Sequence, residues 1–395
     1  MNKKTFKDIE VTGKKVFVRV DFNVPIDENN KILDDTRIMA ALPTINYLVH
    51  QGAKVILCSH LGRPKGMFNP KFSLAPVAKR LQEIMKITVK LASDCIGESA
   101  KKLTSEMQNG EIVMLENIRF YKEEEENDEQ FSKDLASLAE VYINDAFGTA
   151  HRAHASTAGI ARHLPSVAGF LMSKEIVSLS KAVNQATPPF VVVLGGAKIS
   201  DKIGVIGKLL KKANVFLIGG AMANTFIVAK GGNIGMSRYE KDKIDVAKKI
   251  LDEAEKLNVK FVLPVDVVVA KDFAPNAKSK NVDIYNIPDE YQGMDIGKRT
   301  RKIFAQEIKK ANTIVWNGPL GVYEFKKFQK GTLKIAKAVA KSDSVSIVGG
   351  GDSVAAITEL GYASKVTHLS TGGGATLKFL EGAVLPGVEM LEDKE

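Results

Sequence analysis

Cysteine and tryptophan are scarce in this chain of 395 residues, which contains 2 Cys and 1 Trp. Cys58 and Cys95 allow at most one disulfide bridge, and without a CxxC pair the sequence offers no zinc site. The longest apolar runs, such as 190–194 and 261–270, are too short to cross a bilayer. Residues 1–10 contain no apolar signal core. We therefore expect a globular, cytoplasmic protein that does not enter a membrane.

Basic residues outnumber acidic ones, which gives a net charge of +10. Most of this excess follows residue 190, where lysines are dispersed among acidic residues, as is typical of solvated helix faces. In contrast, 7 of the 10 arginines and 5 of the 6 histidines precede residue 190. Arginine suits planar, bidentate binding of carboxylate and phosphate groups. This distribution favours a compact anion-binding site in the first half over positive charge spread across the whole surface.

Short apolar runs alternate with longer periodic segments along most of the chain, which predicts strands alternating with helices. The predicted strands include 15–20, 53–58 and 190–194. Apolar runs without polar alternation indicate strands covered on both faces, and a βαβα order implies parallel sheets. Because the strands are many for one sheet, we expect an α/β protein with two doubly wound, Rossmann-like domains and a cleft between them. The acidic run 123–126 is interpreted as a solvated loop or helix start.

The boundary between the two halves is expected near residues 170–190. Ser173 is a candidate N-cap for a helix that reaches about residue 185, before the turn at Pro188 and Pro189. We predict an N-terminal domain over 1–172, a connecting helix over 173–186 and a C-terminal domain over 187–379. In open α/β sheets, ligands bind beyond the carboxyl ends of the strands.

Polar residues follow four predicted strands of the first half. The segments are DFNVP from Asp21, SHLGRP from Ser59, ENIRF from Glu116 and a long segment from Asn144 to His154. Arg37 lies near the start of the first long helix, where a cation is unexpected unless an anion lies nearby. Each residue alone has an ordinary structural explanation. Their repetition at the same topological position favours a site for a small ligand with several negative charges.

Glycines follow the predicted strands of the second half, as in Gly195-Gly196, Gly219-Gly220 and the run 349–351. Glycine lets backbone N–H groups approach a phosphate, and a helix that follows adds partial positive charge. Lys198 and Lys202 are predicted to share one face of a helix that starts near Ser200. Asp352 suits a magnesium ion whose remaining ligands are nucleotide phosphates.

Two other functions require sequence features that this chain lacks. A nicotinamide-dependent oxidoreductase requires GxGxxG after the first strand, where this chain has DFNVP. A nucleic-acid-binding module is suggested by the positive charge, but it would require clustered basic residues interleaved with aromatic ones. The sequence also contains no GxxxxGK[ST] and no GxSxG motif, so neither a P-loop nor a serine nucleophile is indicated.

The motifs of this chain resemble those of phosphoglycerate kinases, in the order of that family, from about residue 15 to 376. They are RVDFNVP, DDTRI, SHLGRP, ENIRF, NDAFGTAHRAHAS, LGGAKISDK, GGAMANTF, WNGPLGVYE, GGGDS and STGGGA. At Tyr323 and Ser353, many members of that family have Phe and Thr instead. Tyr323 keeps the size of the side chain, and Ser353 keeps the hydroxyl group. The resemblance implies two α/β lobes and a C-terminal tail, about 380–395, folded back on the first lobe.

The resemblance also implies an activity, namely reversible phosphoryl transfer from 1,3-bisphosphoglycerate to ADP, which gives 3-phosphoglycerate and ATP with Mg²⁺. The residues expected to bind phosphoglycerate are Asp21, Asn23, Arg37, His60, Arg63, Arg119 and Arg152. Those expected to bind the nucleotide are Gly196, Lys202, Gly220, Gly293, Glu324, Gly350, Gly351, Asp352 and Ser353, with Asp352 on the metal. The groups expected to stabilise the moving phosphoryl are Arg37, Lys198, Lys202 and the backbone of Gly373 and Gly374.

No general base is expected, because the attacking group is already ionised. Donors on two lobes imply hinge closure before in-line transfer. We expect small-molecule substrates only, no nucleic acid or membrane partner, and a monomer.

Overall fold

The computed structural model describes residues 3–394, which form two compact units. Unit 1 contains the described residues up to Val177 and those from Val384 onward, and unit 2 contains Ser178–Ala383. Each unit is built around a six-stranded parallel sheet, so the expected α/β class with two parallel-sheet domains is confirmed. No helix in the described part of the chain is long and apolar enough to span a membrane.

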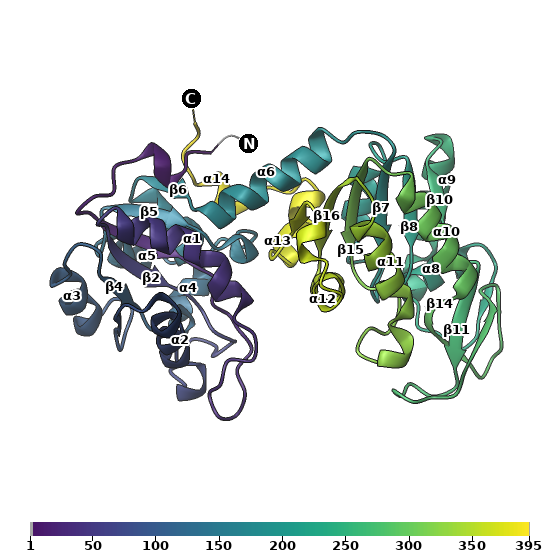
Figure 1. Cartoon of the computed structure of the whole chain (residues 1–395), viewed down its shortest axis with the longest axis horizontal. Coiled ribbons are helices and arrows are strands. Elements are labelled where there is room, and N and C mark those ends of the chain that lie inside the picture. The colour runs from purple at the N-terminus through teal and green to yellow at the C-terminus, as the bar shows by residue number, and fades with distance from the viewer. Residues whose placement is uncertain (1–2, 395) are drawn as a thin grey trace. The chain divides into compact units, whose positions relative to one another are not determined.

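The sheet of unit 1 has the strand order β3-β4-β2-β1-β5-β6 (Figure 1). Its strands are β1 (Lys15–Arg19), β2 (Lys54–Cys58), β3 (Val89–Leu91), β4 (Ile112–Met114), β5 (Val141–Asn144) and β6 (Ser166–Ala168). Its longer helices are α1 (Thr36–His50), α2 (Ala75–Met85), α3 (Glu98–Ser105) and α5 (Glu129–Ala136), with the short α4 (Lys122–Glu126). The central strands are buried on both faces, which explains their unbroken apolar character.

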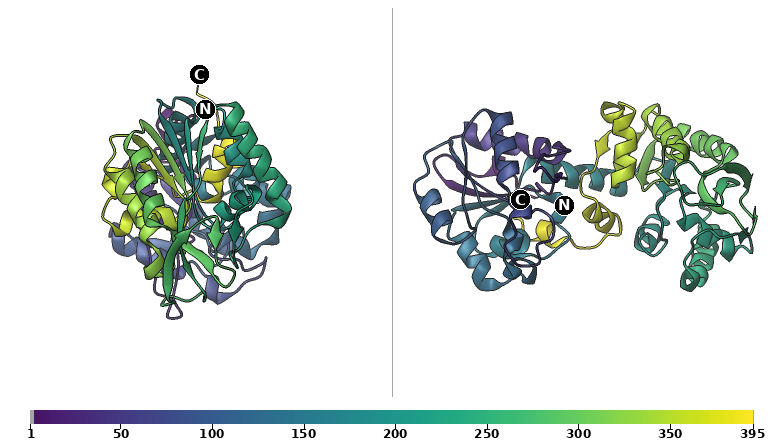
Figure 2. Two further views of the ribbon diagram at one scale, coloured as in Figure 1. Left: turned by 90° about the vertical axis from the view of Figure 1, so that its right-hand side faces the viewer. Right: turned by 90° about the horizontal axis from the view of Figure 1, so that it is seen from below.

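The sheet of unit 2 has the order β10-β8-β7-β15-β16-β17. Its strands are β7 (Phe190–Leu194), β8 (Val215–Ile218), β10 (Lys260–Val262), β15 (Thr313–Asn317), β16 (Val345–Gly349) and β17 (His368–Leu369). One group of packed helices is α10 (Lys298–Lys309), α11 (Lys330–Ala340) and α12 (Gly351–Glu359). The pair α8 (Met222–Ala229) and α9 (Ile244–Lys256) lies on the opposite side of the strands in Figure 2. Two shorter helices, α7 (Ile203–Leu209) and α13 (Gly374–Leu380), pack against each other.

Unit 2 also contains small sheets that were not predicted. An antiparallel sheet has the order β12-β11-β14, with β11 (Asp266–Ala270), β12 (Ser279–Asp283) and β14 (Gln292–Ile296). A second pair joins β9 (Asn233–Ile234) to β13 (Asn286–Ile287). β12 is almost entirely exposed and polar, so it carried no apolar signal. The apolar run 261–270 is divided between β10 and β11 by Pro264.

Helix α6 (Phe170–Asn184) contains the division between the units and begins three residues before the expected cap at Ser173. The expected cap is therefore wrong, because Ser173 lies inside the helix. Asp145, from the loop after β5, accepts a hydrogen bond from the backbone N–H of Met172 at 3.1 Å instead. Burial raises the pKa of Asp145 to about 6.

The C-terminal segment belongs to unit 1 and contains α14 (Pro386–Glu389). The Asn144 side chain donates a hydrogen bond to the Gly387 carbonyl at 3.0 Å, and the Gly387 N–H donates to the Ala150 carbonyl at 2.9 Å. The Lys4 N–H donates to the Glu392 carbonyl at 2.8 Å. Both ends of the described chain therefore contribute to unit 1.

Candidate functional sites in the two units

The loops that follow β4, β2, β1 and β5 leave the same edge of the sheet in unit 1, because these strands are adjacent and parallel. His60 follows β2 and is buried. Burial is the main cause that lowers the pKa of His60 well below its ordinary value, followed by the charges of Arg19, Arg119, Arg37 and Arg152. Three of the four predicted arginines are therefore close enough for their charges to lower the pKa of this imidazole, which is neutral.

Arg37 is the second residue of α1, where the helix N-terminus disfavours a cation. Its Nη1 donates to both carboxylate oxygens of Asp21 at 2.8 Å, and this ion pair holds the guanidinium at the edge of the sheet. The Asp21 side chain is 10% exposed and the Arg37 side chain 38% exposed. Part of the Arg37 guanidinium thus remains accessible to a ligand.

Gly62 joins two further predicted residues. The Gly62 N–H donates to Asn23 Oδ1 at 2.9 Å, and the Gly62 carbonyl accepts from Arg119 Nη1 at 2.8 Å. Arg119 Nε lies 3.4 Å from Glu125 Oε1 and makes no hydrogen bond. Arg152 Nε approaches His151 Nε2 at 3.3 Å. Arg63 is exposed and has neither an ion pair nor a hydrogen bond within residues 3–394.

A buried ionic network next to His60 was not predicted from the sequence. Arg19 is completely buried at the end of β1, with its Nη2 3.2 Å from His60 Nδ1. Its Nε donates to Ser156 Oγ at 2.7 Å, and that hydroxyl donates to Glu124 Oε1 at 2.6 Å. Glu124 Oε1 also lies 3.6 Å from His154 Nδ1.

Glu124 corrects the interpretation of the acidic run 123–126 as solvated. The run forms α4, and Glu124 within it is completely buried while Glu125 and Glu126 are exposed. Although burial alone would raise the pKa of Glu124, its hydrogen bond to His154 and the charge of Arg19 lower it below the ordinary value. The only sequence signal for this network was an arginine in the apolar strand KVFVR.

The glycines after the strands of unit 2 fall into two groups. Some allow loops to pack closely: a Cβ on Gly195 would lie 2.0 Å from the Pro319 carbonyl oxygen, and one on Gly220 2.6 Å from the Gly196 nitrogen. Others face open space, because a Cβ on Gly196, Gly351 or Gly373 would meet nothing within 4 Å. The second group is the one that leaves room for a ligand next to the backbone.

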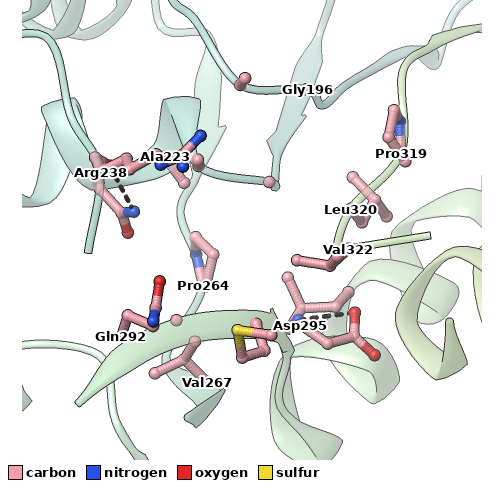
Figure 3. A pocket seen from close by; sticks show the side chains of 18 of the residues that line it. Gly196, Ala223, Arg238, Pro264, Val267, Gln292, Asp295, Pro319, Leu320 and Val322 are labelled. Atoms are coloured by element: carbon pink, nitrogen blue, oxygen red, sulfur yellow. Dashed lines mark hydrogen bonds between the residues drawn. The ribbon is translucent and has the colours of Figure 1, made fainter. Parts of the chain in front are cut away.

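A cavity of about 300 Å³ lies within unit 2 (Figure 3). Five predicted nucleotide contacts line it, namely Gly196, Gly220, Gly293, Glu324 and Asp352. Its wall is mostly apolar, with contributions from Val267, Met294, Leu320 and Val322. The predicted residues that do not line this cavity are Lys198, Lys202, Gly350, Gly351, Ser353, Gly373 and Gly374.

Lys198 and Lys202 do not share a helix face, so that expectation is wrong. Residues 200–202 form a turn, and α7 begins only at Ile203. Lys198 is exposed, whereas Lys202 is buried and its Nζ donates to Asn317 Oδ1. Burial lowers the pKa of Lys202 to about 8.

Asn317 belongs to the motif WNGPLGVYE, but no binding role was predicted for it from the sequence. It ends β15, and its buried Nδ2 has no hydrogen-bond partner within residues 3–394. A Cβ on Gly350, at the carboxyl end of the neighbouring strand β16, would lie 3.5 Å from both side-chain polar atoms of Asn317. This amide is therefore a donor available to an anion beside the glycine run.

Helix α12 begins at Gly351 after the N-cap residue Gly350, whose φ is 88°. Asp352 lies in its first turn and is exposed, and burial followed by the charge of Glu324 raises its pKa. Ser353 is buried, and its Oγ accepts a hydrogen bond from the Gly318 N–H at 2.9 Å. Gly373 caps the N-terminus of α13 with φ 51°.

No group of three or more His, Cys, Asp or Glu side chains suited to a metal ion occurs in the described part of the chain. Asp352 fits Mg²⁺ as a single carboxylate ligand, since this ion is usually bound by one or two carboxylates together with phosphates and waters. The donor set is thus consistent with an ion that arrives with a nucleotide.

Fold and sites together define an α/β protein of two parallel-sheet units, one with clustered arginines and one with a glycine-bordered cavity. The family model described as phosphoglycerate kinase matches residues 6–383. Phosphoglycerate kinases from Clostridium novyi and Pelotomaculum thermopropionicum are 53% and 52% identical to this chain, and each alignment covers 100% of both chains. Solved phosphoglycerate kinase structures from Coxiella burnetii and Pyrococcus horikoshii give TM-scores of 0.88 and 0.86 at 40% and 37% identity, with 98% of both chains covered.

The chain therefore belongs to the phosphoglycerate kinase family, as its motifs indicated. It is an enzyme of the kinase class, a transferase of glycolysis. This assignment replaces the oxidoreductase and nucleic-acid-binding alternatives.

Proposed function

We propose that this enzyme transfers a phosphoryl group reversibly and directly from 1,3-bisphosphoglycerate to ADP, which gives 3-phosphoglycerate and ATP, with Mg²⁺ bound to the nucleotide. The observation that carries the proposal is the set of guanidinium groups around the buried, neutral His60. A ligand with two or more negative charges is the chemistry that compensates such a cluster.

Unit 1 is proposed to bind phosphoglycerate. Arg63, Arg119 and Arg152 supply donors for its anionic groups, and Arg37 supplies those that Asp21 leaves accessible. A neutral His60 adds hydrogen bonding without further charge. Asn23 fixes the loop that carries Gly62, because its Oδ1 accepts the Gly62 N–H.

Unit 2 is proposed to bind the nucleotide in its apolar cavity, with Gly196, Gly220 and Gly293 against the base and Glu324 toward the ribose. The phosphates would extend toward Gly350–Ser353, where the N-terminus of α12 favours negative charge. Asp352 would hold Mg²⁺, which when bound neutralises charge on the phosphate oxygens. Asn317 Nδ2 and Lys202 Nζ supply further donors near the glycine run.

The transfer step needs positioning and charge stabilisation more than proton chemistry. Arg37, Lys198, Lys202 and the backbone N–H groups of Gly373 and Gly374 are the proposed donors to the equatorial oxygens of the moving phosphoryl. Since these donors belong to different units, we infer a hinge at the connecting segment 173–186 that closes before in-line transfer and excludes water. We further propose that the enzyme is a cytoplasmic monomer.

A coupled assay of ATP formation from 1,3-bisphosphoglycerate and ADP tests the function, with Mg²⁺ present or chelated. We expect turnover that depends on both substrates and is lost on chelation. Turnover that persists in excess chelator would contradict the role of the metal. No ATP formation by a folded sample that still binds ADP would contradict the reaction itself.

A further inference from the structure

One wall of the cavity in unit 2 is the segment 318–325 after β15, here called the cavity loop. Leu320, Val322 and Glu324 from this loop line the cavity, and Glu324 is the residue proposed to face the ribose. Figure 3 shows Leu320 and Val322 on the side of the cavity where Asp295 lies. Because the loop lies outside the helices and strands, contacts with its neighbours must hold it in place.

Asp295 in β14 joins the cavity loop to the antiparallel sheet. An isolated bridge pairs Asp295 with Gly321, and the Val322 N–H donates to the Met294 carbonyl at 2.8 Å. A Cβ on Gly321 would lie 2.3 Å from Asp295 Oδ1, so only glycine leaves room for the carboxylate at this point. Asp295 is consequently buried against the loop, with 4% of the residue exposed.

The Asp295 carboxylate accepts two backbone hydrogen bonds from different elements. Its Oδ1 accepts from the Ile296 N–H in β14 at 2.9 Å, and its Oδ2 accepts from the Gly331 N–H at 2.7 Å. Gly331 is the second residue of α11, whose N-cap residue Gln329 makes no capping hydrogen bond with its side chain. An ionised carboxylate suits this position, because it has only acceptors and the N-terminus of a helix favours negative charge. Asp295 therefore links β14, the cavity loop and α11.

A neutral Asp295 would hold these elements less well. A protonated carboxyl has an O–H donor and less acceptor capacity, so one of the two backbone N–H groups loses a full partner. Burial raises the pKa of Asp295 to about 7, although its backbone hydrogen bonds and the charges of Arg301 in α10 and Lys330 in α11 oppose this rise. The cavity loop adds the ionisable Tyr323 and Glu324. The carboxylate is thus ionised at pH 8 and mostly protonated at pH 6.

We propose that the ionised carboxylate of Asp295 is a positioning group for the nucleotide, which holds the cavity loop, and with it Glu324, in the geometry that binds ADP. Asp295 acts through this loop rather than through contact with the ligand. Thr332 adds a neutral link, since its Oγ1 accepts a hydrogen bond from the Leu320 N–H at 3.0 Å. The inference rests on the proposed function, because it assumes that the nucleotide occupies this cavity.

The variant Asp295→Asn tests the inference, because it keeps the size of the side chain but replaces one acceptor oxygen by an N–H₂ donor. We expect the magnesium–ADP complex to bind roughly tenfold more weakly at pH 8, since a buried N–H group loses its acceptor and the loop shifts. KM for ADP should rise, whereas KM for 1,3-bisphosphoglycerate, which is proposed to bind unit 1, should stay close to wild type. Calorimetry and steady-state kinetics measure these effects. Unchanged ADP affinity would overturn the inference.

Asp266→Asn is the matched control within the same unit. Asp266 in β11 is buried, and its carboxylate accepts from the N–H groups of Arg299 and Thr300 in the first turn of α10. It does not line the cavity. We expect both variants to unfold at a lower urea concentration than wild type, but only Asp295→Asn to lose ADP affinity. A comparable loss of ADP affinity in both would overturn the inference, because it indicates general loosening of unit 2.

The pH dependence of adenosine binding supplies a test on the wild-type chain, which does not require the variant to fold. Adenosine has no phosphate and does not titrate between pH 6 and pH 8.5, so an NMR titration reports changes in the protein. We expect the wild-type affinity to fall roughly fivefold from pH 8.5 to pH 6, as Asp295 becomes protonated. Asp295→Asn should show little of this decline. Constant affinity in the wild type, or the same decline in the variant, would overturn the inference.

The two proposals fail in different ways. If the wild-type chain binds ADP and forms ATP, but Asp295→Asn binds ADP equally well, only the positioning role is wrong. If the wild-type chain binds no nucleotide, the proposed function is wrong as well.

Discussion

The polar edge of the sheet in unit 1 is lined with charged side chains, whereas the corresponding edge in unit 2 is lined with glycines. Arginine side chains carry positive charge over a long reach, but these charges repel each other. Carboxylates such as Asp21 and Glu124 must therefore offset the repulsion. Glycine backbone supplies weaker donors that need no counter-charge but require close approach. Unit 1 therefore depends on a buried ionic network, while unit 2 depends on loop conformation.

The sharpest test of this difference removes a buried charge from unit 1. Glu124→Ala removes the buried carboxylate that accepts from Ser156 and lies 3.6 Å from His154, and it leaves the charge of the buried Arg19 uncompensated. We therefore expect a loss of about 3–5 kcal/mol in the free energy of unfolding. Urea denaturation followed by circular dichroism would measure it. Glu126→Ala, at an exposed position of the same helix, is the control. If both variants unfold at the same urea concentration, the network does not stabilise unit 1.

The second test removes a donor from the edge of unit 1. Arg37→Ala should lower kcat about 100- to 1000-fold, which is the usual cost of losing one preorganised transition-state donor. ADP affinity should remain close to wild type, because Arg37 belongs to the other unit. Steady-state kinetics and an ADP titration measure the two effects. Arg162→Ala, which removes an exposed arginine of the same unit, is the control, and an unchanged kcat in Arg37→Ala would refute the assigned role.

The third test removes the carboxylate from the glycine edge of unit 2. Asp352→Ala should weaken binding of the magnesium–ADP complex about 10- to 100-fold, as expected for loss of a charged interaction. Binding of ADP without Mg²⁺ should change much less. Titrations with and without the metal compare the two affinities, and Asp343→Ala at an exposed position serves as the control. Equal losses under both conditions would remove Asp352 as a metal ligand.

The fourth and smallest effect concerns pH. Since burial lowers the pKa of Lys202 to about 8, its charge is present below that pH and is lost above it. We expect kcat/KM for ADP to fall roughly fourfold between pH 7 and pH 8.5. A pH–rate profile compares wild type with Lys202→Arg, which stays charged and should lack this decline. The same decline in both proteins would assign it to another group.

The main sheets could be predicted because their strands are buried on both faces and are therefore apolar throughout. The predicted strands 15–20, 53–58 and 190–194 agree with β1, β2 and β7 within a residue or so. The antiparallel sheet of unit 2 escaped prediction because its strand Ser279–Asp283 is polar and exposed. Its stability comes from pairing with Asp266–Ala270, which a local pattern does not reveal.

The parts of the candidate site that depend on sheet topology could be predicted from the sequence. The parts that depend on which side chains are buried could not. The strand-end rule located His60 and Arg119, because parallel neighbours deliver their loops to one edge. It could not reveal that Arg19 and Glu124 are buried partners, since the linking Ser156 lies 137 residues from Arg19 in the chain. Nor could spacing alone show that a turn, not a helix, separates Lys198 from Lys202.

The hydrogen bonds from Gly387 and Glu392 to the first unit have a consequence for biosynthesis. During translation, unit 1 is made first, but the segment from Val384 that completes it leaves the ribosome only after unit 2. Unit 1 therefore lacks its C-terminal segment while roughly two hundred further residues are synthesised, which takes about 10–40 s at typical elongation rates. A nascent chain stalled after residue 383 would be more sensitive to proteases within unit 1 than the finished enzyme.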